Sequence, residues 1–536
     1  MHLSPLDITV VVVYAIFILV LAQLVSREKA GHRKDSQDYF LASRALPWWA
    51  IGTSLIAANI SAEQIIGMSG SGYAIGLGIA SYEWMAALTL LIVGKFFLPI
   101  FLKNKIYTMP EFLKRRYGQD IQLVMAIFWL VLYVFVNLTS ILWLGATAVH
   151  TVTGLTLQTS LIVLGLFAGN YALYGGLKAV ALTDVVQVSM LVLGGLVIVY
   201  IALERIAGGT GILSVFHGFN MLVAQAPGHF HMILKPNDPN YTYLPGLSVI
   251  LGGMWVANLS YWGFNQYIIQ RALAAKSVRE AQKGIVLAAF LKLLIPVLVV
   301  IPGIAAFILA PRLGWHLAQS NDAYPMLMTL LPSGFLGLVF IALIAAIIAS
   351  MGSKINSIAT IFTIDVFKTV YKNTNERMLV VVGRLTAITA LGIAMVTAKP
   401  LLGSFDQAFQ YIQDFTGFFT PGIVVIFLLG MFWKRATEAG ALTAAVSSVG
   451  LSYIYYNKWP YIPAFDALGR IPFMNRMGYV FLLCLGLAVI VSLMQKPKPQ
   501  TTTIDLADID YSTSKSFWIA SSAVVAILVA LYATWW

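Results

Sequence analysis

Long apolar runs separated by short polar segments dominate the sequence. A helix needs about 20 apolar residues to cross the hydrocarbon core of a bilayer. The runs of that length are 7–26, 47–70, 76–101, 120–150, 155–174, 179–203, 246–268, 282–311, 333–366, 377–398, 402–433, 438–457, 476–494 and 515–536. Only "GGLK" separates the fifth run from the sixth, so thirteen is an alternative count. The pattern predicts an all-α membrane protein with about 14 transmembrane helices.

Composition supports a membrane protein. The 536 residues are 59% hydrophobic and only 10% charged, whereas about 25% of the residues in a soluble domain are charged. The single cysteine, Cys484, excludes an intrachain disulfide and a cysteine-based metal site. The leader "MHLSPLD" lacks a basic region and no small-residue cleavage motif follows, so we expect the first apolar run to be a retained helix.

The distribution of Lys and Arg predicts the orientation of the helices. If the segment after the first run is cytoplasmic and the sides alternate, the cytoplasmic segments with their flanks hold 23 of the 34 Lys and Arg. The outer segments hold 7. The main clusters are "REKAGHRK" (27–34), "LKRRY" (113–117) and "RALAAKSVREAQK" (271–283). With an even number of helices, both termini are predicted to be extracytoplasmic.

Several functional classes are disfavoured. The net charge of +12 is concentrated in these clusters, where it faces anionic lipid, and no basic face with interleaved aromatic residues predicts a nucleic-acid partner. His229 and His231 in the long outer segment 204–245 are only a weak metal signal. An enzyme is disfavoured because HExxH, GxSxG and a nucleotide loop are missing. A transporter-like sensor is disfavoured because no large soluble output domain is evident.

Polar residues inside the apolar runs predict a solute site. An ionisable group at mid-bilayer costs roughly 2.5–3.5 kcal/mol on insertion scales, so it needs a partner or a hydrated cavity. Such groups are Glu63, Glu83, Lys95, Asp184, Lys292, Lys354, Arg384, Asp406 and Asp414, together with the amides Asn59, Gln64, Asn258, Asn265, Gln266, Gln410 and Gln413. Lys95, Arg384 and Asp406 lie near run ends, where snorkelling explains them.

Two similar polar inserts occur about two hundred residues apart. "AANIS" (57–61) lies in the second run and "VANLS" (256–260) in the seventh. Runs two to six and seven to eleven form two groups of five, so the groups have inverted orientations. The inserts then mark the first helix of each group, where transporters of this architecture interrupt a helix at the solute site. The alternative is a packing face of small residues with Asn bonded across helices.

The ninth run carries a stripe of small and polar residues. Ala346, Ser350, Ser353 and Ser357 recur at spacings of four, three and four, which places them on one face of a helix. Such a stripe offers hydroxyl oxygens to a hard cation. It is equally typical of close helix packing.

Three stretches resemble the sodium/solute symporter family. They are "SLIAANISAEQIIGMSGSGYAIGLGIASYEWM" (54–85), "GGMWVANLSYWGFNQYIIQRALAAKSVREAQKGI" (252–285) and "QAFQYIQDFTGFFTPGI" (407–423). The resemblance is strongest to the branch of bacterial sodium/galactose symporters, which are related to the animal sodium/glucose cotransporters. It extends over nearly the whole chain.

The resemblance implies a LeuT-type core of ten helices in a five-plus-five inverted repeat. The expected organisation is a leading helix with a basic cytoplasmic loop (1–46), a first repeat (47–203), an outer loop (204–245), a second repeat (246–433) and three trailing helices (434–536).

The resemblance also implies a sugar site in the middle of the core. The positions that match the sugar contacts are Gln64, Tyr82, Glu83, Asn258, Lys292 and Gln413. Tyr261 matches the aromatic residue that closes the site on the cytoplasmic side, and Asn59 matches its hydrogen-bond partner. Met68, Tyr82 and Phe409 match an apolar lid on the outer side. An alternative role for Glu83 and Lys292 is simple mutual neutralisation.

The resemblance also implies a sodium site, and the positions that match its ligands are the carbonyls of Ala57, Ile60 and Ala346 and the hydroxyl of Ser350. Sugar-transporting members often have a serine where this chain has Ala349, and Lys354 also departs from the close relatives. We expect Lys354 either to repel sodium or to hasten its release. Asp184 matches an acid on the inner exit path of the ion.

The sequence thus predicts sodium-coupled symport of a monosaccharide, galactose or glucose, by alternating access in the inner or plasma membrane, with sodium as the co-transported ion and no organic cofactor. The alternative is sodium- or proton-coupled symport of another small polar solute, such as myo-inositol, sialic acid or an amino acid, on the same fold. The oligomeric state is left open.

Overall fold

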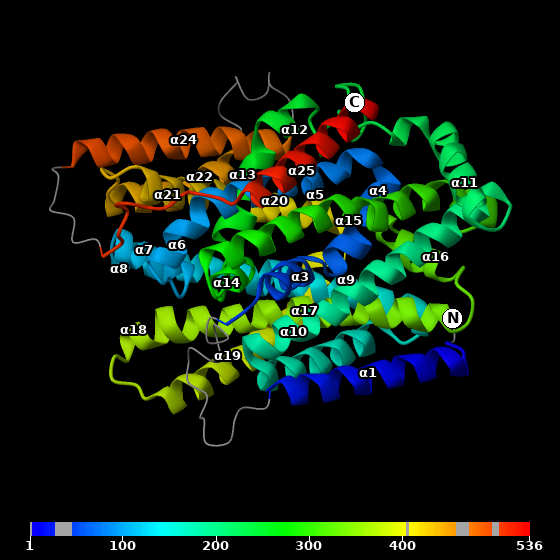
Figure 1. Ribbon diagram of the computed structural model, residues 1–536, viewed down its shortest axis with the longest axis horizontal. Coiled ribbons are helices and arrows are strands. Elements are labelled where there is room, and N and C mark those ends of the chain that lie inside the picture. Colours follow the sequence, from blue (N-terminus) through cyan, green and yellow to red (C-terminus); the bar gives the residue numbers. More distant parts are fainter. Residues whose placement is uncertain (1–2, 27–44, 404–406, 457–470, 496–502) are drawn as a thin grey trace.

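The protein is a bundle of helices that run mostly along its longest axis (Figure 1). The computed structural model describes residues 3–26, 45–403, 407–456, 471–495 and 503–536. Within these ranges the extended structure is limited to one isolated bridge between Leu46 and Ala275. The predicted all-α membrane class is confirmed. The basic cluster 27–34 and Asp406 lie outside the described residues.

The part of the chain up to residue 225 forms these helices and π or 3-10 turns (η): α1 (Pro5–Ser26), α3 (Trp48–Asn59), η2 (Glu63–Met68), α4 (Ser69–Ala74), η3 (Leu77–Ala80), α5 (Ser81–Ile92), η4 (Val93–Phe97), α6 (Leu98–Lys103), α7 (Met109–Arg116), α8 (Gln119–Val131), η5 (Leu132–Leu138), α9 (Thr139–Thr153), α10 (Leu157–Ala207) and α11 (Ile212–Gln225). The last of these, α11, lies inside the predicted outer loop.

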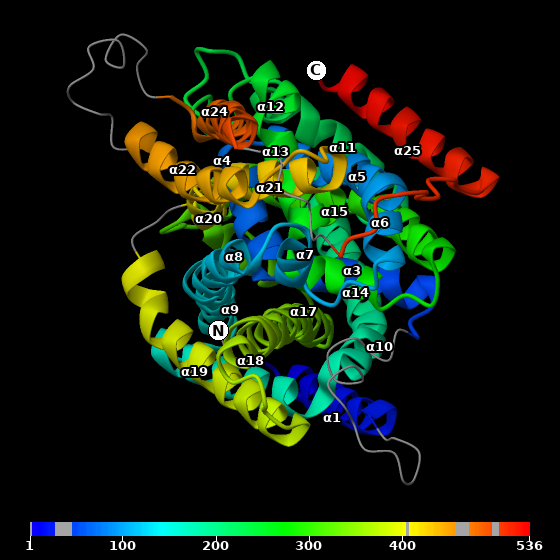
Figure 2. The same ribbon diagram turned by 90° about the vertical axis from the view of Figure 1, so that its left-hand side faces the viewer.

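The rest of the chain forms η6 (Pro227–His229), α12 (Leu247–Leu251), α13 (Gly253–Leu259), η7 (Ser260–Phe264), α14 (Gln266–Leu273), α15 (Val278–Leu313), η8 (Ser320–Asp322), α16 (Ala323–Met328), α17 (Phe335–Thr360), η9 (Ile361–Phe367), α18 (Lys368–Val370), α19 (Glu376–Leu402), α20 (Ala408–Thr416), α21 (Thr420–Phe432), α22 (Glu438–Tyr456), α24 (Phe473–Met494) and α25 (Lys515–Thr534). The helices α1, α19 and α25 lie at the rim of the bundle when it is viewed end-on (Figure 2).

Among the described residues, eight helical runs are long and apolar enough to cross a membrane. A ninth is the pair α20 and α21, which meet at a bend of 47°. This count covers only the described side chains, which leaves just Pro5–Ile18 of the 22-residue helix α1 and Leu157–Gly169 of α10 as shorter apolar helices, so the total of fourteen stays a prediction.

The fifth and sixth predicted runs are not separate helices. They form the continuous helical segment α10 of 51 residues, which would be roughly 75 Å long if it were straight. That length is more than twice the hydrocarbon core of a bilayer. Within α10, Leu157–Gly169 and Asp184–Ala207 are the apolar parts whose side chains are described. The backbone stays helical through "GGLK", so a helix boundary there is not supported, and the counts of fourteen and thirteen both stay predictions.

The insert "AANIS" interrupts the second predicted helix, as expected. Helix α3 ends at Asn59, and Ile60 has extended backbone angles (φ −72°, ψ 110°). Side chains replace the lost helical bonds: the side-chain oxygen of Gln64 accepts from the backbone N–H of Ser61 at 3.3 Å, and the hydroxyl of Ser61 accepts from the N–H of Glu63 at 3.2 Å. A non-helical backbone is tolerated at membrane depth only with such partners.

The second insert does not itself break a helix. The Asn258 amide donates to the carbonyl of Met254 at 3.1 Å, one turn back, and the chain stays helical through "VANLS". The break comes after the π turn η7, at Asn265 (φ −83°, ψ 121°). There the hydroxyl of Tyr133 donates to Asn265 and accepts from the N–H of Gln266 at 3.0 Å. The predicted break was therefore misplaced by about five residues.

Glycines allow the central helices to approach closely. An added Cβ at Gly303 of α15 would lie 2.1 Å from the carbonyl oxygen of Ser69 in α4. An added Cβ at Gly72 would lie 2.8 Å from the carbonyl oxygen of Val300. Helix α15 also packs along α3 and α5. These close contacts hold the interrupted second helix against the long helix that carries Lys292.

Each end of the chain contacts a segment in or next to a predicted outer segment. The Asp7 carboxylate accepts from the N–H groups of Gly334 and Gly337, each at 2.7 Å, at the start of α17. The carbonyl of Trp535 accepts from the N–H of Met232 at 2.7 Å. The first contact lies at the start of the ninth predicted run and the second lies in the predicted outer segment 204–245, so a common outer side for the two termini stays a prediction.

Candidate functional site

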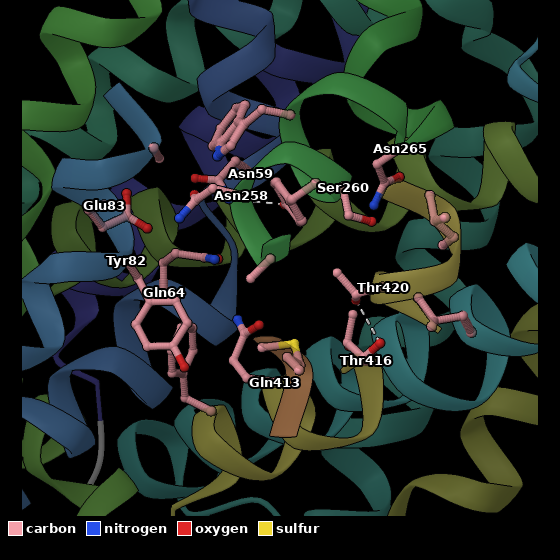
Figure 3. Close-up of a pocket in the computed structure, with 18 of the residues that line it drawn as sticks. Asn59, Gln64, Tyr82, Glu83, Asn258, Ser260, Asn265, Gln413, Thr416 and Thr420 are labelled. Carbon is pink, nitrogen blue, oxygen red and sulfur yellow. Dashed lines mark hydrogen bonds between the residues drawn. The ribbon is translucent and has the colours of Figure 1, made fainter. Parts of the chain in front are cut away.

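A polar cavity lies where the interrupted helices meet. It is bordered by Asn59, Gln64, Tyr82, Glu83, Ala86, Trp129, Leu132, Ala257, Asn258, Ser260, Tyr261, Trp262, Asn265, Lys292, Phe409, Gln413, Thr416, Thr420, Ile423 and Met477. All six predicted substrate contacts border it. Figure 3 shows Glu83, Asn59 and Asn258 facing Gln413 across the cavity. Trailing helix α24 also reaches it, through Met477.

A buried ion pair forms one wall of the cavity. The Lys292 ammonium of α15 contacts the carboxylate of Glu83 in α5 and also the amide oxygen of Asn59. Lys292 is 1% exposed and Glu83 is 3% exposed. The ammonium also lies 4.7 Å from the ring centroid of Trp262. Because burial of two charges is costly, the pair needs these further contacts. The structure thus holds a donor and an acceptor in fixed positions at the cavity surface.

The amides around the pair keep unused hydrogen-bonding atoms. Gln64 uses its oxygen on Ser61, which leaves its amide N–H₂ available among the described contacts. Asn258 uses its N–H₂ on the carbonyl of Met254, which leaves its oxygen available in the same sense. Figure 3 shows the Gln413 side chain pointing into the space between them. The wall therefore offers both donors and acceptors to a ligand.

Aromatic residues close the cavity on two sides. The Asn59 amide donates to the hydroxyl of Tyr261 at 3.0 Å, which joins helix α3 to the turn η7. The rings of Tyr82 and Phe409 meet edge-to-face, with their centroids 5.1 Å apart at 86°. Met68 is fully buried but is not among the residues that border the cavity. The predicted lid is thus formed at the cavity surface by Tyr82 and Phe409 alone.

The predicted ion ligands lie where α3 ends against α17. Ser350 of α17 donates its hydroxyl to the carbonyl of Ala58 at 3.1 Å. Because the N–H of Ser61 bonds to a side chain, the carbonyl of Ala57 has lost its helical partner. Ile60, at the extended position, and Ala346, one turn before Ser350, complete the predicted set. The end of α3 thus presents carbonyl oxygens beside a hydroxyl, which is a chemistry suited to a hard cation.

The polar stripe on α17 faces charged groups. Ser350 accepts from the Lys354 ammonium at 3.1 Å. Ser353 donates to the carbonyl of Ala349 at 2.8 Å and accepts from Arg271. The stripe was predicted either to offer hydroxyl oxygens to a cation or to allow close helix packing. Close packing alone does not explain it, since these hydroxyls bind cationic side chains.

Asp184 is linked to a base through a serine. Its carboxylate accepts from the hydroxyl of Ser54 at 2.5 Å, and Ser54 accepts from the Nε of Arg271 at 3.2 Å. Both charged residues are fully buried. This corrects the expectation that Arg271 belongs to a basic loop cluster, because it lies in the last turn of α14 and is buried inside the bundle. The guanidinium of Arg271 can be buried because Asp184 lies close by, on the other side of Ser54. The assignment of Arg271 to a loop did not take this acid into account.

Sequence reasoning also missed Asp365, although it lies inside the ninth predicted run. This buried carboxylate accepts from the Gln122 amide at 2.8 Å and from the Thr108 hydroxyl at 3.1 Å. It thereby ties the turn η9 to α7 and α8. An acid within an apolar run was the signal that could have identified it.

Other polar residues follow the predictions only in part. Arg384 is exposed and Lys95 is half-buried over the ring of Trp518, consistent with snorkelling. Asp414 pairs with Arg476. Among the described residues, no three His, Cys, Asp or Glu side chains lie together so that they could hold a metal ion. His229 and His231 instead contact separate backbone carbonyls, of Tyr73 and Trp536.

A helical membrane bundle with a cavity bordered by polar side chains at two helix breaks is typical of a membrane transporter. The model of the Sodium:solute symporter family matches residues 39–447. The chain belongs to the sodium:solute symporter family and is therefore a sodium-coupled transporter, not an enzyme.

Similar proteins extend over the full chain. The chain is 49% identical to a sodium/glucose cotransporter of Vibrio parahaemolyticus, over 100% of this chain and 99% of the relative. It is 33% identical to the human sodium/myo-inositol cotransporter, over 84% of this chain and 67% of the relative. The fold is similar to a substrate-bound, outward-open Na⁺-coupled sialic acid symporter, with a TM-score of 0.79 and 21% identity over 93% of this chain and 99% of that one.

Proposed function

We propose that the protein carries a monosaccharide, galactose or glucose, across the membrane together with sodium by alternating access. The observation that carries this proposal is the cavity wall formed by Glu83, Lys292, Asn258, Gln64 and Gln413. Each sugar hydroxyl both donates and accepts. A wall with one acceptor-only group, one donor-only group and three amides matches a ring of such hydroxyls.

Aromatic residues at the cavity suit the less polar face of a sugar. Tyr261 and Trp262 border the cavity, with ring centroids 5.1 Å apart in an edge-to-face arrangement. A pyranose presents C–H groups on its faces, and an aromatic ring covers such a face without leaving a polar group unpaired. The full-length similarity to a sodium/glucose cotransporter supports the same class of substrate.

The main alternative is another small polar solute on the same fold. A polyol such as myo-inositol also presents a ring of hydroxyls, and a sodium/myo-inositol cotransporter is among the relatives. Sialic acid and amino acids carry a carboxylate, which would meet the carboxylate of Glu83. The ion pair with Lys292 therefore favours a neutral solute over an anionic one.

The fold proposed for this function is a LeuT-type, five-plus-five inverted repeat within about 14 transmembrane helices. Two helix breaks support it, one at residues 60–62 and one at Asn265, each in the first helix of a proposed repeat. The first repeat then covers 47–203 and the second covers 246–433. In this arrangement α10 supplies two spans and the chain reverses direction between them. Contacts of both of its ends with the same part of α17 support this, since Leu164 and Ile347 both approach Gly145, and Ala342 approaches Gly194.

In the proposed cycle, sodium from outside binds the carbonyls of Ala57, Ile60 and Ala346 and the hydroxyl of Ser350. The ion thereby holds the end of α3 against α17. Sugar then closes the outer lid at Tyr82 and Phe409.

Opening toward the inside requires the Asn59–Tyr261 bond to break, since it joins helices on either side of the cavity. Sodium then leaves past Asp184. With the basic segments on the inside, both termini are extracytoplasmic, and the protein resides in the inner or plasma membrane.

A competition binding assay tests the substrate class. Labelled D-galactose is bound to the purified protein with sodium or with potassium, and D-glucose, myo-inositol, sialic acid and proline are added as competitors. We expect sodium-dependent binding that glucose displaces. Gln413→Ala is expected to weaken it roughly tenfold or more, because a hydrogen bond is lost. Ile423→Val is the matched control at the apolar part of the wall. Displacement by proline or sialic acid but not by glucose would overturn the proposal.

A further inference from the structure

The ammonium group of a lysine donates a hydrogen bond to Ser350, the hydroxyl that is proposed to bind the sodium ion. Lys354 lies one helical turn after Ser350 on α17, and its Nζ donates to the Ser350 oxygen at 3.1 Å. Lys354 is fully buried. The Ser350 proton is directed to the carbonyl of Ala58, at 3.1 Å. An oxygen lone pair of Ser350 is thus directed at an ammonium group.

The Lys354 ammonium has a second potential partner, the carboxylate of Glu63. Oε2 of Glu63 lies 4.0 Å from Lys354 Nζ, so the two form an ion pair that is too long for a hydrogen bond. Glu63 is fixed by its other oxygen, which accepts from the Ser140 hydroxyl. The Nζ also lies 4.6 Å from the ring centroid of Tyr267. A shift of about 1 Å toward Glu63 would bring Nζ to hydrogen-bond distance of the carboxylate.

The ammonium and a sodium ion require the same feature of Ser350. Lysine offers donors only, so it binds an oxygen lone pair. Sodium, as a hard cation, also needs that lone pair as a ligand. Two like charges on one oxygen repel each other. Arg271, which binds Ser353 one turn away, adds a further positive charge to this region.

We propose that Lys354 is a tethered competitor of the co-transported sodium ion for Ser350. In the loaded form the ion takes the Ser350 oxygen and Lys354 moves onto Glu63; when the ion leaves, Lys354 returns to Ser350. The inference rests on the proposed sodium site. It assigns Lys354 and Glu63 as the pair that sets sodium affinity, a role distinct from holding the sugar.

The decisive variant removes the competitor without changing the net charge. Lys354→Met alone leaves the Glu63 carboxylate unpaired, and a negative charge near the site would by itself attract sodium. Lys354→Met/Glu63→Gln removes both charges. If only net charge matters, the double variant binds sodium like the original protein. If lysine competes for Ser350, the double variant binds sodium more tightly.

The measurement is equilibrium binding of ²²Na⁺ to the purified full-length protein, without sugar. We expect Lys354→Met/Glu63→Gln to lower the sodium dissociation constant about tenfold. Glu63→Gln alone is expected to raise it several-fold, because Lys354 loses its alternative partner. Lys95→Met, a lysine on Trp518 away from the cavity, is the matched control and is expected to have no effect. An unchanged or higher dissociation constant in the double variant would overturn the inference.

Two further arms keep the outcomes distinct. Lys354→Gln/Glu63→Gln replaces the double variant if the latter does not fold, as judged by size-exclusion chromatography. Sodium-dependent sugar uptake by the original protein tests the proposed function separately. If that uptake is present and the double variant binds sodium no more tightly, only the inference fails. If uptake is absent but the double variant gains sodium affinity, the sugar proposal fails and the inference stands.

Discussion

Asn59 joins three helical elements through one amide. Its N–H₂ donates to the hydroxyl of Tyr261 at 3.0 Å, and its oxygen accepts from Lys292. The first polar insert is therefore bonded to the aromatic residue that directly follows the second insert. The inner closure of the cavity and its ion pair share this one residue. Movement of Tyr261 is thus coupled to the groups proposed to hold the sugar.

Removal of the Tyr261 hydroxyl is predicted to loosen the inner closure while leaving sugar binding nearly intact. Tyr261→Phe retains the ring but loses a hydrogen bond of about 1 kcal/mol. We expect sodium-free efflux of labelled sugar from preloaded proteoliposomes to rise roughly fivefold, with little change in sugar affinity. Tyr411→Phe, on helix α20, is the control. An efflux rate equal to that of the original protein would contradict the role of the Asn59–Tyr261 bond.

Removal of one partner of the buried ion pair is predicted to destabilise the protein more than removal of both partners. Lys292→Met leaves Glu83 uncompensated, which costs about 3–5 kcal/mol in such pairs. We expect a clear fall in the thermal midpoint for this variant and a partial recovery in Lys292→Met/Glu83→Gln. Sugar binding is lost in both. The thermal midpoint is measured by heating samples of each variant and determining the remaining folded protein by size-exclusion chromatography. A single variant as stable as the double would contradict the buried pair.

A methyl group at Gly303 is predicted to separate two central helices. Its Cβ would lie 2.1 Å from the Ser69 carbonyl oxygen, so both backbones would have to move. Overpacking typically costs about 1–3 kcal/mol. Gly303→Ala should lower the thermal midpoint, whereas Gly392→Ala, with nothing within 4 Å, should be neutral or stabilising. Equal midpoints for the two variants would show that α4 and α15 tolerate a wider spacing.

Asp7 is predicted to hold the leading helix on α17. Its carboxylate accepts two N–H groups at the start of α17, and such a cap is worth about 0.5–2 kcal/mol. Asp7→Ala should speed hydrogen exchange at Gly334 and Gly337, because both amides lose their partner. Thr9→Ala, on the exposed side of α1, is the control. Unchanged exchange at the two glycines would show that α1 contributes no anchor there.

The sequence was informative for several polar groups that lie inside apolar runs and need a buried partner, although Asp365 was missed. Glu83, Lys292 and Asn258 were identified because an apolar run cannot leave them unpaired, and all three border one cavity. The break at "AANIS" was predicted on different grounds, from the position of two similar polar inserts in the first helix of each group of five runs. The three polar side chains depend on burial, which composition reveals directly.

Other features depend on partners from distant segments, which the local sequence does not specify. The second break moved to Asn265 because Tyr133, 132 residues away, supplies the hydrogen bonds there. Arg271 entered the bundle because Ser54 and Ser353 receive its guanidinium. Each is a tertiary contact that overrides a local charge pattern. The repeat boundaries and the ion ligands stay predictions.

The most direct test of sodium-coupled sugar transport is uptake of labelled D-galactose into proteoliposomes, with an inward sodium gradient compared with a potassium gradient. One charge crossing 100 mV contributes about 2.3 kcal/mol, and a tenfold sodium gradient adds about 1.4. Together they support an accumulation of up to roughly 500-fold per ion at tight coupling. The account predicts sodium-dependent accumulation above equilibrium that D-glucose blocks. Equilibration without accumulation, equal in both salts, would contradict it.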